Sequence, residues 1–187
     1  VGRVNAAQRR QLGVIRSAAI SMAILAADVE ELLRGTEYPL DGPPRPFSIR
    51  KVFDDVRRIL GPLQEVKQIE LHIRAPTGDA HYCLGHPAAL RRVLLNLGMN
   101  ALQATANGGM VIIAARRHGR EQVEFQVSDN GPGFGTQSLA AGLGLKMCRD
   151  LLAALGSTLQ MRTLPNGGLV RFTIDLPPAA VPPEVPA

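Results

Sequence analysis

A glycine-rich stretch at residues 127–145 (VSDNGPGFGTQSLAAGLGL) limits the folds open to this chain more than any other segment. Apolar and polar residues alternate over 123–127 (VEFQV), which predicts a buried β-strand leading into it. The first glycine turn, residues 129–133 (DNGPG), sets a carboxylate in a bend that Gly and Pro permit. The second glycine turn, residues 142–145 (GLGL), opens an apolar stretch of helical period. This order is typical of a nucleotide pocket, because a carboxylate can accept a hydrogen bond from adenine N6 and bare backbone N–H groups can face phosphates.

A second signal is the segment 90–104 (LRRVLLNLGMNALQA), which has the pattern of a helix. Asn96 and Asn100 are four residues apart, so they share one face among apolar neighbours. Asn is a poor residue for a helix interior, and two of them one turn apart indicate a side-chain function. An acidic glycine turn alone is usually only a turn. The second glycine turn and this helix together favour a binding site.

These three motifs resemble a known family. LRRVLLNLGMNALQAT resembles the N box of bacterial sensor histidine kinases, DNGPG resembles their G1 box, and GLGL resembles their G2 box. Their order and approximate spacing match, and the similarity covers nearly the whole chain except the last dozen residues. The chain is therefore similar to the C-terminal part of a sensor histidine kinase, within the gyrase, heat-shock chaperone, histidine kinase and MutL ATPase superfamily. The resemblance implies ATP and Mg²⁺ as cofactors.

By resemblance, Asn100 is the Mg²⁺ ligand and Asn96 its catalytic companion. Mg²⁺ arrives with the phosphates and needs few protein oxygens, and an amide oxygen supplies one without adding negative charge. The alternative for Asn100 is a helix Asn that caps a neighbouring loop. Related ATPases such as gyrase place at the Asn96 position a Glu that activates water. Asn has no accessible basic form, so Asn96 argues for γ-phosphoryl transfer to another nucleophile instead of fast hydrolysis.

Asp129 is assigned to the adenine amine, with a turn-capping Asp as the alternative. Glycines let the backbone approach the base at the first turn and the phosphates at the second. Lys146 could reach a phosphate, although a solvated Lys is an equal expectation. The candidate nucleotide-binding residues are Asp129, Gly131, Gly133, Gly142, Leu143, Gly144, Leu145 and Lys146.

Three features depart from the family pattern. His86 stands where Asp is common and is expected to be a cap or surface residue, and Gln103 replaces a common Lys. The loop 134–141 between the glycine turns has eight residues and no Lys, Arg or His. Such a short lid would cover a nucleotide poorly, which predicts weak affinity or activity.

Residues 3–34 read as one long helix in which Leu12, Ile15, Ala19, Met22 and further apolar residues step by three and then four. That is a heptad seam, which needs a partner helix. The alternative is that this helix packs onto its own domain. The resemblance implies instead the second helix of the dimerisation and phosphotransfer hairpin. No His precedes His72, so the phosphoacceptor His is missing from this segment.

The expected domains are 1–34, the dimerisation helix; 35–47, a Pro- and Gly-rich linker; 48–177, the ATP-binding domain; and 178–187, a disordered Pro-rich tail. Ser48 is the expected N-cap of a helix that Gly61-Pro62 would break or kink. The fold class is α+β: a two-layer α/β sandwich with a mixed sheet of about five or six strands and three helices, preceded by one long bundle-type helix. Strands are expected near 69–73, 82–84, 110–116, 122–128, 158–163 and 169–176.

Composition narrows the setting. The 187 residues are 45% hydrophobic, enough for one core plus an appended element, and no run of apolar residues is long enough to span a membrane. The formal charge is +5, but the basic residues are scattered and aromatics make up only 4%, so no nucleic-acid partner is expected. The two cysteines are far apart, without metal-ligand spacing, which favours a reduced, cytoplasmic location.

The leading functional hypothesis is therefore the ATP-binding region of a dimeric sensor histidine kinase that works with a response regulator receiver domain. The runner-up is a binding module with a degenerate pocket that dimerises and docks a regulator; the short lid, His86 and Gln103 favour it. A third reading is a superfamily ATPase or a kinase of an anti-sigma pathway. The heptad helix followed by a linker argues against this third reading.

Overall fold

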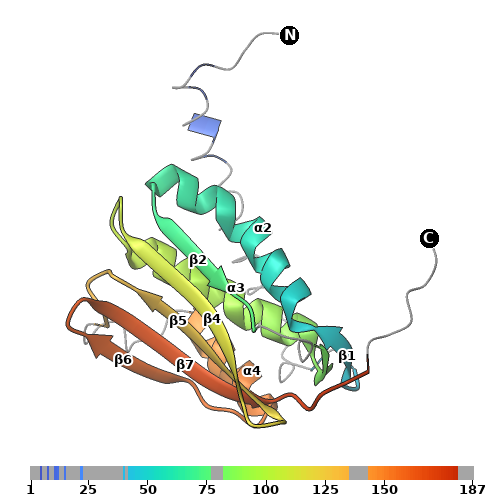
Figure 1. Cartoon of the computed structure of the whole chain (residues 1–187). Coiled ribbons are helices and arrows are strands. Elements are labelled where there is room, and N and C mark those ends of the chain that lie inside the picture. Colours follow the sequence, from blue (N-terminus) through green and yellow to red (C-terminus); the bar gives the residue numbers. More distant parts are fainter. Residues whose placement is uncertain are drawn as a thin grey trace.

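The computed structural model describes residues 42–76, 82–134 and 143–180, together with Asn5, Gln8, Gln11, Leu12, Ile15, Met22 and Leu40. The described helices are α2 (Ile49–Lys67), α3 (Pro87–Ala104) and α4 (Leu143–Ala154). The strands are β1 (Arg45–Ser48), β2 (Glu70–Arg74), β3 (Tyr82–Gly85), β4 (Met110–His118), β5 (Gln122–Asp129), β6 (Gln160–Leu164) and β7 (Gly167–Asp175). The helices cover one face of a twisted sheet, so the described part has two layers (Figure 1).

The main sheet has five strands in the order β2-β4-β5-β7-β6. β2 and β4 are parallel and the other pairs are antiparallel, so the sheet is mixed. Strands β1 and β3 form a separate antiparallel pair. The α+β sandwich expected from the sequence is confirmed.

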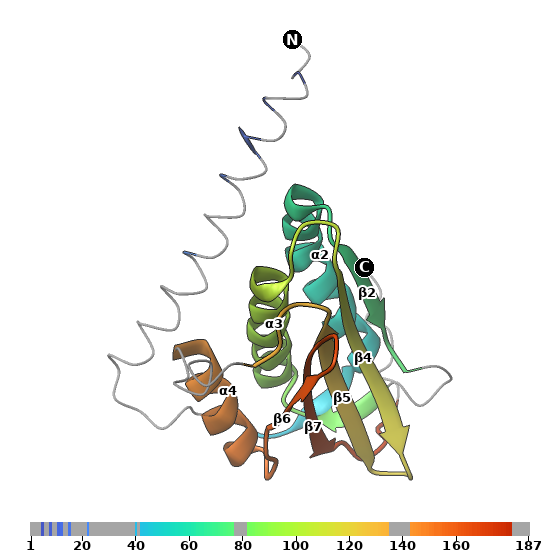
Figure 2. The same cartoon turned by 90° about the vertical axis from the view of Figure 1, so that its left-hand side faces the viewer.

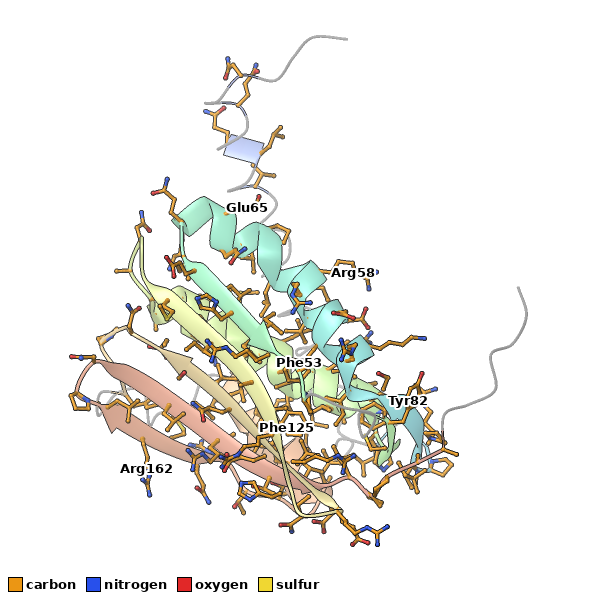
Figure 3. All side chains as sticks on the ribbon, in the orientation of Figure 1. Phe53, Arg58, Glu65, Tyr82, Phe125 and Arg162 are labelled. Carbon is orange, nitrogen blue, oxygen red and sulfur yellow. The ribbon has the colours of Figure 1, made fainter. Side chains whose placement is uncertain are left out.

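Alternating side chains of the sheet point to the helices and form the core. Phe125 of β5 stacks on Phe172 of β7 with ring centroids 5.1 Å apart, and Phe53 of α2 reaches Phe125 at 6.3 Å. Figure 3 shows Phe53 and Phe125 between the helix layer and the sheet, whereas Arg162 points away from the helices. Burying each ring stabilises the fold by about 1.5–3 kcal/mol, so the two layers are held together here.

Helix α2 begins as predicted and ends later than predicted. The Ser48 hydroxyl accepts a hydrogen bond from the backbone N–H of Lys51 at 3.4 Å, which confirms Ser48 as the N-cap. Of the break or kink expected at Gly61-Pro62, the break is wrong, because α2 continues to Lys67 with Pro62 inside it. The apolar stripe of α2 is buried on both sides of Pro62, at Leu60 and Leu63, and this packing offsets the backbone bond that proline removes.

Two pairings were not expected at the ends of the domain. Residues 45–47, assigned to the linker, belong to β1 and pair with β3. On the other side of β3, the backbone N–H of Leu84 donates to the carbonyl of Pro177, and that of Ala179 donates to the carbonyl of Tyr82. The expectation of a disordered tail from residue 178 is therefore wrong for 178–180; residues 181–187 lie outside the described part.

Most of the expected helix 3–34 lies outside the described residues, as do residues 35–39 and 41 of the linker. The described positions Gln8, Gln11, Leu12, Ile15 and Met22 are helical. Three of them are exposed apolar residues of the predicted seam: Leu12 at 55%, Ile15 at 63% and Met22 at 69%. Within the described part of the chain, no helix combines the length and the apolar character needed to span a membrane.

Candidate functional site

Helix α3 is the centre of the site, packed between α2 and α4 (Figure 2). Asn96 is buried at 6% exposure, and its side-chain N–H donates to the carbonyl of Arg92 at 3.1 Å. Its amide oxygen lies 2.9 Å from the point that a Cβ on Gly144 would occupy. The asparagine one turn from Asn100 therefore contacts the second glycine turn directly.

The other end of α3 contacts the first glycine turn. The carbonyl oxygen of Ala104 lies 2.9 Å from the point that a Cβ on Gly131 would occupy. Residues 96, 100 and 104 follow one another at intervals of four, so they lie along one face of the helix. Asn100, which is exposed, is therefore placed between the positions that contact the two glycine turns.

Asp129 ends β5 and is half-buried, opposite Val111 of β4 and Gly168 of β7. One carboxylate oxygen accepts a hydrogen bond from the backbone N–H of Gly131 at 2.9 Å. The other oxygen lies 2.9 Å from the point that a Cβ on Gly168 would occupy. Asp129 thus caps the turn with one oxygen, as the alternative interpretation proposed, and keeps the second oxygen available for a ligand amine.

The residues beside Asp129, namely Phe134, Thr163 and Gly168, were not predicted as site residues from the sequence. The Thr163 hydroxyl accepts a hydrogen bond from the backbone N–H of Phe134 and donates one to the carbonyl oxygen of Phe134, each at 3.2 Å. The Phe134 ring lies 3.2 Å from the Cβ point of Gly168. At Gly133, φ is +73°, a conformation that favours glycine, and a Cβ there would lie 2.6 Å from the Thr163 methyl group. The pairing of β5 with β7 brings Gly168 to Asp129, and the pairing of β6 with β7 adds Thr163.

The second glycine turn is described in part. Gly142 lies outside the described residues, and so does the side chain of Leu143, whose backbone begins α4. Leu145 is buried in the core and Lys146 is exposed. The first N–H groups of α4 have no partner within the helix, so this end suits an anion.

The residues present fit a nucleotide bound with Mg²⁺. A Cβ at Gly131, Gly144 or Gly168 would lie 2.9 Å from an oxygen of Asp129 or Asn96, so only glycine leaves room around these polar atoms. Asn100 offers an exposed amide oxygen, which is a donor of the kind that Mg²⁺ takes alongside phosphate oxygens. The donor set therefore matches the cofactors expected from the sequence.

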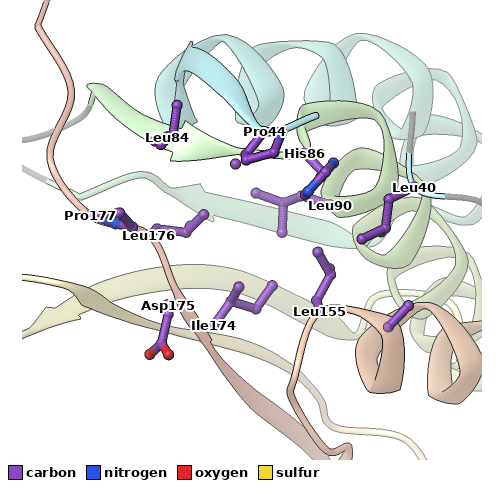
Figure 4. A pocket seen from close by; sticks show the side chains of 12 residues that line it. Leu40, Pro44, Leu84, His86, Leu90, Leu155, Ile174, Asp175, Leu176 and Pro177 are labelled. Atoms are coloured by element: carbon purple, nitrogen blue, oxygen red, sulfur yellow. The ribbon is translucent and has the colours of Figure 1, made fainter. Parts of the chain in front are cut away.

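A cavity lies at the opposite end of α3 (Figure 4). This cavity of about 290 Å³ is lined by Leu40, Pro44, Leu84, Gly85, His86, Leu90, Ala154, Leu155, Ile174, Asp175, Leu176 and Pro177. His86 is the residue before α3, as expected of a cap, but its side chain makes no capping hydrogen bond. None of the predicted site residues that the structure describes lines this cavity, so it is separate from the described part of the candidate site.

Comparison with known proteins identifies the family. Residues 85–180 match the model of the histidine kinase-, DNA gyrase B- and HSP90-like ATPases, which is more than half of the chain. The chain belongs to this family, and its ATPase domain is of the histidine kinase type. The resemblance inferred from the three motifs is confirmed.

The chain is also similar to individual named proteins. The signal transduction histidine-protein kinase BarA of Escherichia coli (strain K12) is 24% identical over 86% of this chain, which spans only 20% of BarA. The structure of full-length ShkA in complex with AMPPNP is 26% identical, with a TM-score of 0.72 over 97% of this chain and 42% of ShkA. The structure of histidine kinase ThkA in complex with the response regulator protein TrrA has the same fold, with a TM-score of 0.66 at 18% identity over 83% of this chain and 48% of that chain.

Proposed function

We propose that this chain is the ATP-binding catalytic region of a two-component sensor histidine kinase. It transfers the γ-phosphoryl group of ATP to a His on a dimerisation hairpin, for relay to an Asp of a response regulator. The observation that supports this most is that α3 contacts both glycine turns, through Asn96 and Ala104, with Asn100 between them. Relatives such as BarA and ThkA are named as histidine kinases.

The residues divide the work of binding. The free carboxylate oxygen of Asp129 accepts a hydrogen bond from the adenine amine beside the Phe134 ring. The N–H groups that begin α4 face the phosphates, and the Asn100 amide oxygen holds Mg²⁺. When bound, Mg²⁺-ATP supplies the phosphoryl group and neutralises its charge, so the protein contributes positioning and electrostatics.

Asn96 acts through position. Its amide has no accessible basic form, so it cannot activate water as a base. The side chain is buried and its N–H donates to the Arg92 carbonyl within α3. It instead fixes the distance between α3 and Gly144. This supports transfer to an external acceptor over hydrolysis, in line with the expectation from the sequence.

Dimerisation and the partner belong to the same proposal. The exposed Leu12, Ile15 and Met22 support a helix that pairs with a second copy of the chain. The acceptor His comes from outside residues 1–71, which contain no His. The receiver-domain partner is supported by the ThkA–TrrA complex, and a cytoplasmic location by the cysteine content.

A degenerate binding module is the second candidate, favoured by the eight-residue loop 134–141 and by Gln103 in place of Lys. Titration with a fluorescent ATP analogue, with and without Mg²⁺, separates the two. The kinase predicts saturable binding that Mg²⁺ strengthens and that unlabelled ATP displaces. Absence of binding in both conditions would exclude the kinase and leave the module.

A further inference from the structure

Lys67, the last residue of α2, reaches across to the end of α3. Its ammonium group donates hydrogen bonds to three backbone carbonyls of that end: Leu102 at 2.8 Å, Gln103 at 2.9 Å and Thr105 at 3.2 Å. An ammonium has three protons, so all three are used. The last carbonyls of a helix have no partner within it, and here a neighbouring helix supplies the partner.

Helix α3 has no basic residue of its own in its last turn. The carbonyl end of a helix carries partial negative charge, which a cation stabilises. The nearby Asp129 carboxylate adds negative charge, since its turn touches Ala104 through Gly131. Lys67 therefore offsets negative charge at the end of α3 that contacts the first glycine turn, the turn proposed to hold the adenine.

The backbone around Lys67 is fixed as firmly as its side chain. The Lys67 carbonyl accepts from the N–H of Gly108 at 3.3 Å, and the N–H of Glu70 donates to the Gly109 carbonyl at 2.8 Å. The next residue, Gln68, has φ of 55° and caps α2 with its backbone N–H. Lys67 thus holds the α3–β4 connection from both sides, by its carbonyl and by its ammonium.

We propose that Lys67 is a positioning residue of the nucleotide site, which ties the end of α3 to α2 and thereby holds Asn100 in place relative to Asp129. This inference rests on the function proposed above. Lys67 acts through Asn100, which lies two residues before the first carbonyl that Lys67 binds. Its loss therefore lowers the part of nucleotide affinity that depends on Mg²⁺.

The test compares Lys67→Met, Lys67→Arg and the control Lys51→Met, which removes an exposed Lys of the same helix. Titration calorimetry with ATP is run with and without Mg²⁺. Lys67→Met should weaken Mg²⁺-ATP binding about tenfold and leave Mg²⁺-free binding nearly unchanged, because charge-assisted hydrogen bonds hold the Asn100 turn. Lys67→Arg should recover part of the loss, and Lys51→Met should bind like wild type.

Two further measurements exclude a purely structural role. Amide hydrogen exchange at residues 101–105 should accelerate in folded Lys67→Met, whereas exchange in the central strands should not. The double variant Lys67→Met/Asn100→Ala should bind no more weakly than Asn100→Ala alone. If Lys67→Met does not fold, Lys67→Gln takes its place.

The outcomes are distinct. Wild-type binding with an unchanged Mg²⁺ effect in folded Lys67→Met would overturn the role of Lys67 and leave the proposed function intact. Additive losses in the double variant would overturn it as well. Failure of the wild-type chain to bind ATP in either condition would overturn the proposed function, and the role of Lys67 with it.

Discussion

The amide oxygen of Asn96 lies 2.9 Å from the point where a Cβ on Gly144 would stand. The Asn96 side chain cannot easily move away from Gly144, because it is buried and its N–H donates to the Arg92 carbonyl. The backbone of Gly144 can come this close only because it has no side chain. The glycine of the second turn is therefore required by a polar contact with α3.

Substitution Gly144→Ala should destabilise the domain by about 1–3 kcal/mol, because the new methyl group displaces a buried amide. Much of this cost should disappear in the Asn96→Ala background, where the clashing oxygen is absent. Urea unfolding of the four proteins measures the coupling between the two positions. Gly61→Ala is the matched control, since a Cβ at Gly61 would meet none of the described residues within 4 Å. Equal costs in both backgrounds would contradict the contact.

Replacement of the exposed Asn100 by Ala should abolish the gain in ATP affinity that Mg²⁺ provides. Stability should change by less than about 0.5 kcal/mol, because the side chain is exposed. Titration calorimetry with and without Mg²⁺ measures the first effect and thermal unfolding the second. An unchanged Mg²⁺-ATP affinity would refute the assignment of Asn100 as the metal ligand.

The substitution Asp129→Asn tests the base-binding carboxylate without disturbing the turn. An Asn side chain keeps an oxygen that can accept the Gly131 N–H, so the turn should persist. The amide nitrogen replaces the second acceptor, so the preference for adenine over guanine nucleotides should fall about tenfold. Competition binding with ATP and GTP measures this preference. The same discrimination in both proteins would show that Asp129 does not recognise the base.

The sequence predicted best what depends on short-range pattern. The alternation in β4 and β5 and the helical period of α3 and α4 are local, and these elements form where expected. β1 was missed because its partner, β3, is remote in the chain and its own Pro and Gly neighbours read as a linker. The break expected at Gly61-Pro62 does not occur, because burial of the apolar stripe of α2 outweighs the local cost of Gly and Pro within a helix.

The candidate site was also predicted only in part, because some of its features are local motifs and others depend on long-range packing. The two glycine turns and the Asn pair are visible as motifs, and α3 brings them together. Thr163 and Gly168 have no local signature, since the pairing of β5 with β7 places Gly168 at Asp129 and the pairing of β6 with β7 places Thr163 next to Gly168. Lys67 was missed because its role depends on the packing of α2 against α3.

The buried thiol of Cys83 predicts a loss of stability at high pH. Burial raises its pKa from 9.0 to about 12, an effect that the Arg117 guanidinium partly opposes. The raised pKa means that the folded state keeps the proton longer than the unfolded chain does. Stability from this group is therefore complete below pH 9 and falls as the pH rises from 9 towards 12. Unfolding measured across this range should show a smaller decline in Cys83→Ala; an identical decline would contradict the assignment.

The Gly168→Ala variant tests whether the space beside Asp129 is needed to bind the adenine, apart from any effect of backbone strain. Its Cβ would stand 2.9 Å from the free oxygen of Asp129 and 3.2 Å from the Phe134 ring, where the adenine amine is expected. ATP affinity should therefore fall by about tenfold or more, because well-packed sites resist an added methyl group. Gly108→Ala is the matched control, because its φ of +77° brings strain while its Cβ would meet no atom of the described part of the chain within 4 Å. That variant should lose about 1–2 kcal/mol of stability and keep its ATP affinity. Calorimetric titration beside urea unfolding measures both quantities, and equal affinity in the two variants would place the adenine away from Gly168.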